Sequence, residues 1–138
     1  MEDRIHLQIV TAGGTVYENR VRAVTLPLSG GECGILAGHA PLMGAVTDGV
    51  VRCTFGEDEH AYIAVGIGVV NVIHDEVTLL VRAAEPAGAI DLARAEASEQ
   101  RARERLAQKA AALDAARAEA SLRRALARQK AAHLASEK

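Results

Sequence analysis

The stretch Glu85-Pro86-Ala87-Gly88-Ala89-Ile90-Asp91 divides the sequence into two parts of very different composition. All twelve glycines, all three prolines and every Phe and Tyr lie at or before residue 88. Gly and Pro are frequent in the turns between strands and rare inside helices, so the break predicts a strand-rich part followed by a helical part. At 138 residues the chain is long enough for one domain with a hydrophobic core and a modest appendage. From the composition break we place the first domain at residues 1–86 and the helical one at residues 87–138.

Before the break, short runs of β-branched residues alternate with Gly-rich and acidic turns. In the first run, Ile5, Leu7 and Ile9 alternate with polar residues, which is the pattern of a strand with one buried face. The predicted strands include residues 5–10, 21–28, 50–55, 62–65, 69–73 and 77–81. Strands of this length and spacing predict a sandwich or a barrel, and of these we expect a β-sandwich of about ten short strands.

After the break, Ala supplies 18 of 50 residues, and most others are strong helix formers. One long helix is compatible with this composition, but residues 110–114 offer a break, with Asp114 placed to cap a second helix. We therefore predict an α+β fold in which the sandwich precedes an antiparallel hairpin of two helices, each about twenty residues long. A seam of Ala buries little apolar area, so we expect a marginally stable hairpin that can detach.

The charge also changes at the break. Residues 1–88 carry five Arg and eleven acidic residues, net −6, whereas residues 89–138 carry eleven Lys or Arg and seven acidic residues, net +4. A basic segment can bind nucleic acid, but these positive charges alternate with Glu, and no Phe, Tyr or Trp is available for stacking on bases. We expect acidic protein partners and no nucleic acid.

Three further features bear on the class of protein. No apolar run reaches the ~20 residues of a membrane span and no signal segment opens the chain, so we expect no membrane insertion. Cys33 and Cys53 lack a metal-binding spacing and are expected as reduced core residues. No HxH or HxxxH spacing supports a metal site among the histidines of the first part. These histidines are His6, His39, His60 and His74.

Two other classes stay open at this point. One is a small jelly-roll enzyme with a histidine-bound metal in the sandwich. The other is a coiled-coil adaptor that dimerises through residues 89–138, although Ala at most apolar positions forms a poor zipper.

One glycine-rich stretch carries a resemblance to a known family. It reads Gly31-Glu32-Cys33-Gly34-Ile35-Leu36-Ala37-Gly38-His39-Ala40-Pro41-Leu42 and resembles the signature loop of the epsilon subunits of F-type ATP synthases. The resemblance extends through residues 7–11, residues 65–69 and the Ala-rich hairpin, and so covers essentially the whole chain. The family commonly has Pro where this chain has Ala37, a change that acts on the unfolded chain by under ~1 kcal/mol.

The resemblance implies a non-catalytic regulatory and coupling subunit, monomeric in isolation, in the central stalk of a proton- or sodium-driven synthase. It places the complex at the cytoplasmic face of the bacterial cell membrane. The sandwich would bind the gamma subunit and the c-ring, and the hairpin would inhibit ATP hydrolysis by engaging acidic loops of the catalytic beta subunits. The implied partner-contact residues are Glu32, Gly34, Ile35, Leu36, His39, Pro41 and Leu42.

A second motif bears on ATP. The stretch Ile90-Asp91-Leu92-Ala93-Arg94-Ala95 resembles the motif of ATP-binding epsilon subunits, and residues 122–128 resemble the segment that completes their site. The resemblance implies no tightly bound cofactor, but ATP, with or without Mg²⁺, as a regulatory ligand. The implied nucleotide-binding residues are Glu85, Asp91, Arg94, Arg124 and Arg128.

Helix geometry is compatible with that site. Arg124 and Arg128 are four residues apart and share one helix face, and a turn near residue 112 places Arg94 opposite about residue 130. Hydrolysis is not expected, because no Gly-Lys-Ser/Thr follows the Gly66-x-Gly68 pattern of a phosphate loop. The same spacing also fits a different interpretation, in which Asp91 caps the first helix and the arginines are surface charges.

Overall fold

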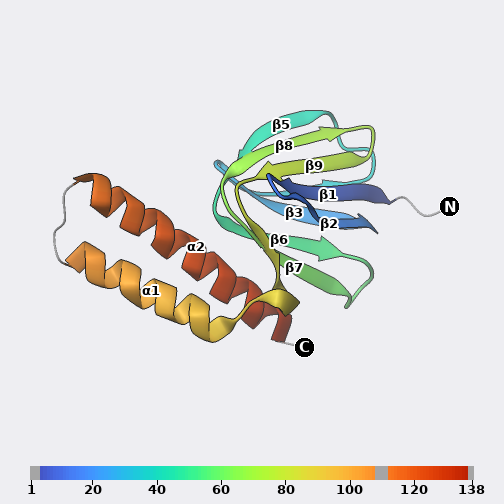
Figure 1. Ribbon diagram of the computed structural model, residues 1–138. Coiled ribbons are helices and arrows are strands. Elements are labelled where there is room, and N and C mark those ends of the chain that lie inside the picture. The colour runs from blue at the N-terminus through green and yellow to red at the C-terminus, as the bar shows by residue number, and fades with distance from the viewer. Residues whose placement is uncertain (1–3, 108–111, 137–138) are drawn as a thin grey trace.

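The computed structural model describes residues 4–107 and 112–136, and shows a β-sandwich beside a helical hairpin (Figure 1). The strands are β1 Ile5–Thr11, β2 Gly14–Val21, β3 Ala23–Leu28, β4 Gly31–Leu36, β5 Leu42–Val46, β6 Gly49–Thr54, β7 His60–Val65, β8 Gly68–Ile73, β9 Glu76–Val81 and β10 Ala84–Pro86. A 3₁₀ turn, η1 Ala87–Ala89, then leads to α1 Leu92–Ala107 and α2 Ala112–Ser136. This architecture confirms the predicted fold class.

The strands form one strongly curved sheet. Their order is β10-β7-β6-β3-β5-β8-β9-β1-β2, with β4 paired to β3. The pairings are antiparallel except that of β1 with β9, where His6 lies opposite Glu76 in parallel register. Because β10 also contacts β1 and β2, the two ends of the strand order meet and the sheet closes around one core.

The core comes from the alternating strand positions. Ile5, Leu7 and Ile9 are fully buried, as their alternation predicts. Cys53 is buried in the same cluster, and Cys33 is half-buried against it; both are free thiols, as expected. In contrast, the apolar side chains that the described part of the hairpin buries are all Ala.

Four strands went unpredicted, and each lacks the expected signal. Strand β2 is mostly exposed and polar, β4 and β5 contain Gly, and β10 is a three-residue edge strand that ends in Pro86. The strand predicted over residues 21–28 is found as β3, but it begins two residues later, because Val21 ends β2 and β3 begins at Ala23.

The two helices are unequal. α1 has 16 residues and α2 has 25, rather than about twenty each. The two helices pack side by side (Figure 1), and residues 108–111 between them lie outside the described part. Asp114 lies inside α2, so its predicted role as a cap was wrong: Ala has the highest helix propensity, and the helix extends N-terminally past Asp114 through Ala112.

α2 lies between α1 and strands β6 and β7 (Figure 1). The Gln129 side chain crosses the helix pair and donates to Glu99 Oε1 at 2.8 Å and to the Ala95 carbonyl at 3.5 Å. This contact agrees with the predicted antiparallel register. The Gln129 amide, and next the Arg103 guanidinium, hold the pKa of the Glu99 carboxyl below its usual value.

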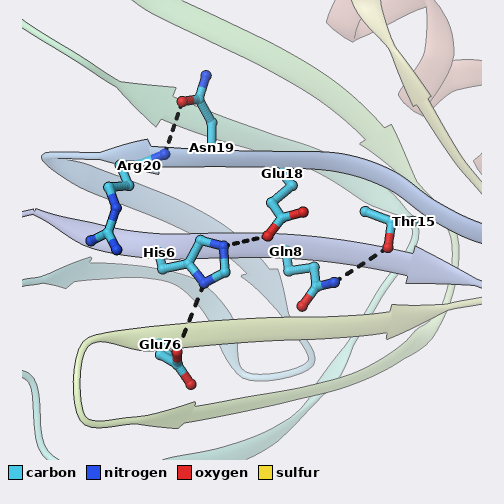
Figure 2. A network of polar contacts seen from close by, with 7 residues as sticks. All are labelled: His6, Gln8, Thr15, Glu18, Asn19, Arg20 and Glu76. Atoms are coloured by element: carbon cyan, nitrogen blue, oxygen red, sulfur yellow. Dashed lines mark hydrogen bonds and ion pairs between the residues drawn. The ribbon is translucent and has the colours of Figure 1, made fainter.

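The outer face of β1 carries a polar network (Figure 2). His6 Nε2 lies 2.6 Å from Glu18 Oε2 on β2, and His6 Nδ1 lies 3.9 Å from Glu76 Oε1 on β9. Gln8 Nε2 donates to Thr15 Oγ1 at 3.3 Å. These are cross-strand pairs on an exposed face, and they link β1 to both of its neighbours. Across residues 4–107 and 112–136 we find no group of three or more His, Cys, Asp or Glu residues arranged to hold a metal ion.

Neither α1 nor α2, over their described residues, is long and apolar enough to cross a bilayer.

Candidate nucleotide cavity and partner-contact loop

A cavity of about 360 Å³ lies between the sandwich and the hairpin. The sandwich side includes Gly66, after β7, and Glu85, on β10. The hairpin side includes Ser98 of α1 and both Arg124 and Arg128 of α2. The structure therefore brings three of the five predicted nucleotide-binding residues to the wall of one cavity, and the volume is within the range of small-ligand sites.

The charges in this cavity are unequal. Arg128 Nε donates to Glu85 Oε1 at 2.8 Å, and both side chains are partly buried. Arg124 Nη2 donates to Ser121 Oγ at 3.1 Å, and has no carboxylate partner within the described residues. The wall therefore presents two guanidiniums and one carboxylate, which leaves a net positive charge suited to phosphate oxygens.

The other two predicted residues lie outside the cavity wall. Asp91 precedes α1, where its Oδ1 accepts from the Arg94 N–H at 3.2 Å and its carbonyl accepts from the Ala95 N–H at 3.0 Å. Asp91 is thus the N-cap of α1, as the alternative interpretation of the sequence predicts. Arg94 is exposed and shares one face of α1 with Ser98, which lies four residues further on and does line the cavity.

Ser98 and Ser121 line the cavity and were missed by sequence reasoning. The sequence gives only a weak indication of them, namely that they are two of only three serines in residues 89–138. Each hydroxyl accepts from a neighbouring guanidinium, Ser98 from Arg101 at 3.0 Å and Ser121 from Arg124.

The glycine-rich stretch forms β4 and the turn that follows it. Glu32, Gly34 and Pro41 are exposed, and Leu36 is 63% exposed, although it is apolar. His39 and Leu42 are partly buried. Six of the seven predicted contact residues are therefore at least partly exposed.

Ile35 corrects that prediction. It is fully buried in the core of the sandwich, because residues alternate between the faces of β4 and Ile35 lies on the inner one. It therefore acts in packing and is not available to a partner.

Strands β5, β8 and β9 carry an exposed apolar surface. Met43 on β5 is 80% exposed, and Val69 on β8 lies opposite Leu80 on β9, both about half exposed. Sequence reasoning did not single out these residues. Exposed apolar residues gathered on one sheet face are typical of a protein-binding surface.

The fold and these two features define a class of protein: a β-sandwich with an exposed apolar face that carries a helical hairpin over a basic cavity. Residues 4–87 match the family described as "ATP synthase, Delta/Epsilon chain, beta-sandwich domain", and residues 89–133 match its "long alpha-helix domain". The chain belongs to the ATP synthase delta/epsilon family, and the relatives it resembles are bacterial epsilon chains.

Two of these relatives show the extent of the similarity. The ATP synthase epsilon chain of Lawsonia intracellularis is 41% identical over 106 residues, which is 77% of this chain and 79% of that one. The epsilon chain of Bacillus subtilis is 41% identical over 102 residues, 74% and 76% of the two chains. Membership in this family argues against the jelly-roll enzyme and the coiled-coil adaptor.

A solved structure shows the same fold. A chain of the Euglena gracilis mitochondrial ATP synthase, in a structure of its OSCP, F1 and c-ring, superposes with a TM-score of 0.78 and 19% identity. The superposition covers 96% of this chain and 81% of that chain.

Proposed function

We propose that this chain is the non-catalytic regulatory and coupling subunit of the central stalk of an F-type ATP synthase. The sandwich binds the gamma subunit and the c-ring, and the complex works at the cytoplasmic face of the bacterial cell membrane. Support comes from the family, from the exposed Leu36 and Pro41 of the glycine-rich stretch, and from the apolar face around Met43.

The hairpin is the regulatory part in this proposal. It changes between the docked position and an extended one that engages acidic loops of the catalytic beta subunits and inhibits ATP hydrolysis. Its net charge of +4 over residues 89–138 favours that contact, and its Ala seam buries little apolar area, so undocking costs little.

ATP binding at the cavity holds the hairpin docked and the subunit non-inhibitory. The observation that carries this is the convergence of Glu85, Arg124 and Arg128 on one cavity, with walls from both the sandwich and the hairpin. The guanidiniums bind phosphate oxygens, and a carboxylate accepts from the adenine amino group. Undocking separates Glu85 from the two arginines, so ATP binds the docked state better and shifts the equilibrium toward it.

The size of the shift follows from linkage. At one hundred times its dissociation constant, ATP favours the docked state by ~2.7 kcal/mol, which is sufficient to reverse the balance of a weakly packed hairpin. The ligand acts here as a sensed signal and is not cleaved.

Calorimetric titration of the isolated chain tests this proposal. We expect ATP to bind and to raise the unfolding temperature, and Arg124→Ala or Arg128→Ala to weaken binding by roughly 10- to 100-fold through loss of a charge-assisted contact. Asp91→Ala should weaken it through loss of the helix cap.

Arg117→Ala is the matched control, since Arg117 is an exposed arginine of α2 that does not line the cavity. Absence of binding at millimolar ATP, or equal responses of Arg124→Ala, Arg128→Ala and Arg117→Ala, would contradict the proposal.

A further inference from the structure

The turn after β4 has a defined geometry. The His39 N–H donates to the Leu36 carbonyl at 3.2 Å, and Gly38 has φ of 82°. A positive φ at the third position defines a type II turn, in which Pro is common at the second position because its ring fixes φ. This chain has Ala37 at that second position, so the residue itself does not restrict the turn to this conformation.

A distant side chain supplies a restraint. The Gly38 N–H donates to Asp75 Oδ1 at 2.7 Å, across 37 residues of sequence. A short hydrogen bond to a carboxylate is stronger than one between neutral groups. The turn of the glycine-rich stretch is therefore tied to the turn between β8 and β9.

Asp75 is itself held in place. His74 and Asp75 have φ of 49° and 60°, the two positive values of a type I′ hairpin, and Asp is among the residues that tolerate them. The Asp75 carbonyl also accepts from the His6 N–H at 2.8 Å, at the start of the β1–β9 pairing. The carboxylate thus projects from a backbone that is fixed on both sides.

We propose that Asp75 is a positioning residue for the partner-contact loop, and that its hydrogen bond to Gly38 holds residues 36–41 in the shape that presents Leu36 and Pro41. The inference rests on the proposed role of this loop in binding the rotor. Asp75 makes the contact surface conformationally ready before binding, so less ordering is needed when the partner arrives.

The full chain with Asp75→Gly is the first test. Gly tolerates a positive φ, so the β8–β9 turn is kept while the carboxylate is lost. We expect hydrogen exchange at the Gly38 amide to become at least tenfold faster, and binding to the rotor of gamma subunit and c-ring to become at least tenfold weaker. Asp75→Asn keeps an acceptor oxygen and should retain most of both.

Asp58→Gly is the matched control, because Asp58 is an exposed acidic residue in the β6–β7 connection. It should change neither the Gly38 exchange rate nor rotor binding.

A rescue experiment separates positioning from a general loss of structure. Ala37→Pro in the Asp75→Gly background fixes the turn from within, and Leu36 in β4 already has the extended backbone that a following Pro requires. We expect rotor binding to return while the Gly38 amide still exchanges fast, because that amide has no carboxylate partner.

Each other result overturns the inference in a distinct way. Unchanged Gly38 exchange in Asp75→Gly would show that the tether does not order the loop. Faster exchange with unchanged rotor binding, or no rescue by Ala37→Pro, would show that loop shape does not control binding. Failure of the unsubstituted chain to bind the rotor would instead overturn the proposed function.

Discussion

Cys53 shows how one buried position controls reactivity. It is fully buried in β6, and burial raises the pKa of its thiol to about 12, with a smaller opposing effect of the Tyr17 hydroxyl. The thiolate is the reactive species, so at pH 8 iodoacetamide should modify the half-buried Cys33 and spare Cys53 until the chain is unfolded in urea. Intact mass measurement distinguishes one adduct from two, and two rapid adducts on the folded chain would contradict the prediction.

The same shift affects stability. The folded-state pKa lies above the unfolded value of about 9, so the contribution of Cys53 is complete below pH 9 and is lost as the pH rises toward 12. The loss is at most ~1.4 kcal/mol per pH unit in that window. Denaturant unfolding at pH 8 and pH 10.5 measures it, and Cys53→Ala, which has no thiol to titrate, should show a smaller decrease.

At this scale, sequence reasoning identified the residue types better than their roles. Glu85, Arg124 and Arg128 converge as predicted from the family motif, but Asp91 is an N-cap and Ile35 a core residue. A cap and a ligand both require an exposed oxygen at a helix start, and spacing alone does not distinguish them. Asp75 had no local signal at all, because its partner Gly38 is 37 residues away.

Between elements, a second ion pair joins the sandwich to α2. Asp48, between β5 and β6, has a side chain only 5% exposed, and its Oδ2 lies 3.4 Å from Nε of Arg123, which is 58% exposed. Docking of the hairpin thus supplies a cation to a largely buried carboxylate of the sandwich. Because Arg123 is largely solvated, water screens the ion pair and limits its stabilising free energy to about 1 kcal/mol.

Arg123→Ala should therefore favour the undocked hairpin, because the docked state then holds Asp48 without its cation. We expect about fivefold faster hydrogen exchange in the segment of α2 that packs on β6 and β7, corresponding to about 1 kcal/mol. Asp48→Asn combined with Arg123→Ala should recover part of the loss, since no unpaired charge remains.

The exposed Arg117→Ala again serves as the comparison. Equal exchange in the Arg123→Ala and Arg117→Ala variants would show that the Asp48 pair does not contribute to docking.

At the scale of elements, composition and periodicity were sufficient to predict the strands whose residues alternate regularly between buried and exposed. β1, β6, β8 and β9 alternate inner and outer residues and were found to within two residues. Strand β2 is mostly exposed and strand β4 buries only Ile35 fully, so both depend on pairing with their neighbours, and backbone pairing leaves little trace in sequence. The lengths of the two helices were not predicted correctly, because neither Gly nor Pro marks a helix end in the Ala-rich sequence.

For the whole molecule, the two parts differ in how they are stabilised. The members of the main hydrophobic cluster all lie in the sandwich strands, whereas the described hairpin buries only Ala side chains. A fragment of residues 1–86 should therefore retain a cooperative thermal transition. Differential scanning calorimetry of the fragment and the full chain is the measurement, and a non-cooperative melt would show that the hairpin is required for the core.

The same truncation tests regulation in the assembled complex. A synthase in which this subunit is truncated to residues 1–86 should still assemble. It should hydrolyse ATP faster than the complex with the full chain, because the basic hairpin is absent. Inhibition as strong as that of the full chain would assign regulation to the sandwich.

The parallel pairing of β1 with β9 determines when the sheet can be completed during synthesis. His6 pairs with Glu76, so the first strand to leave the ribosome must wait for nearly the last strand of the sandwich before its inner edge is covered. Contacts between such distant residues form slowly, whereas the hairpin needs only local contacts. During synthesis, β1 and β2 are therefore an unfinished edge open to wrong partners, and the partly exposed His6 and Gln8 and the exposed Glu18 help to keep that edge soluble.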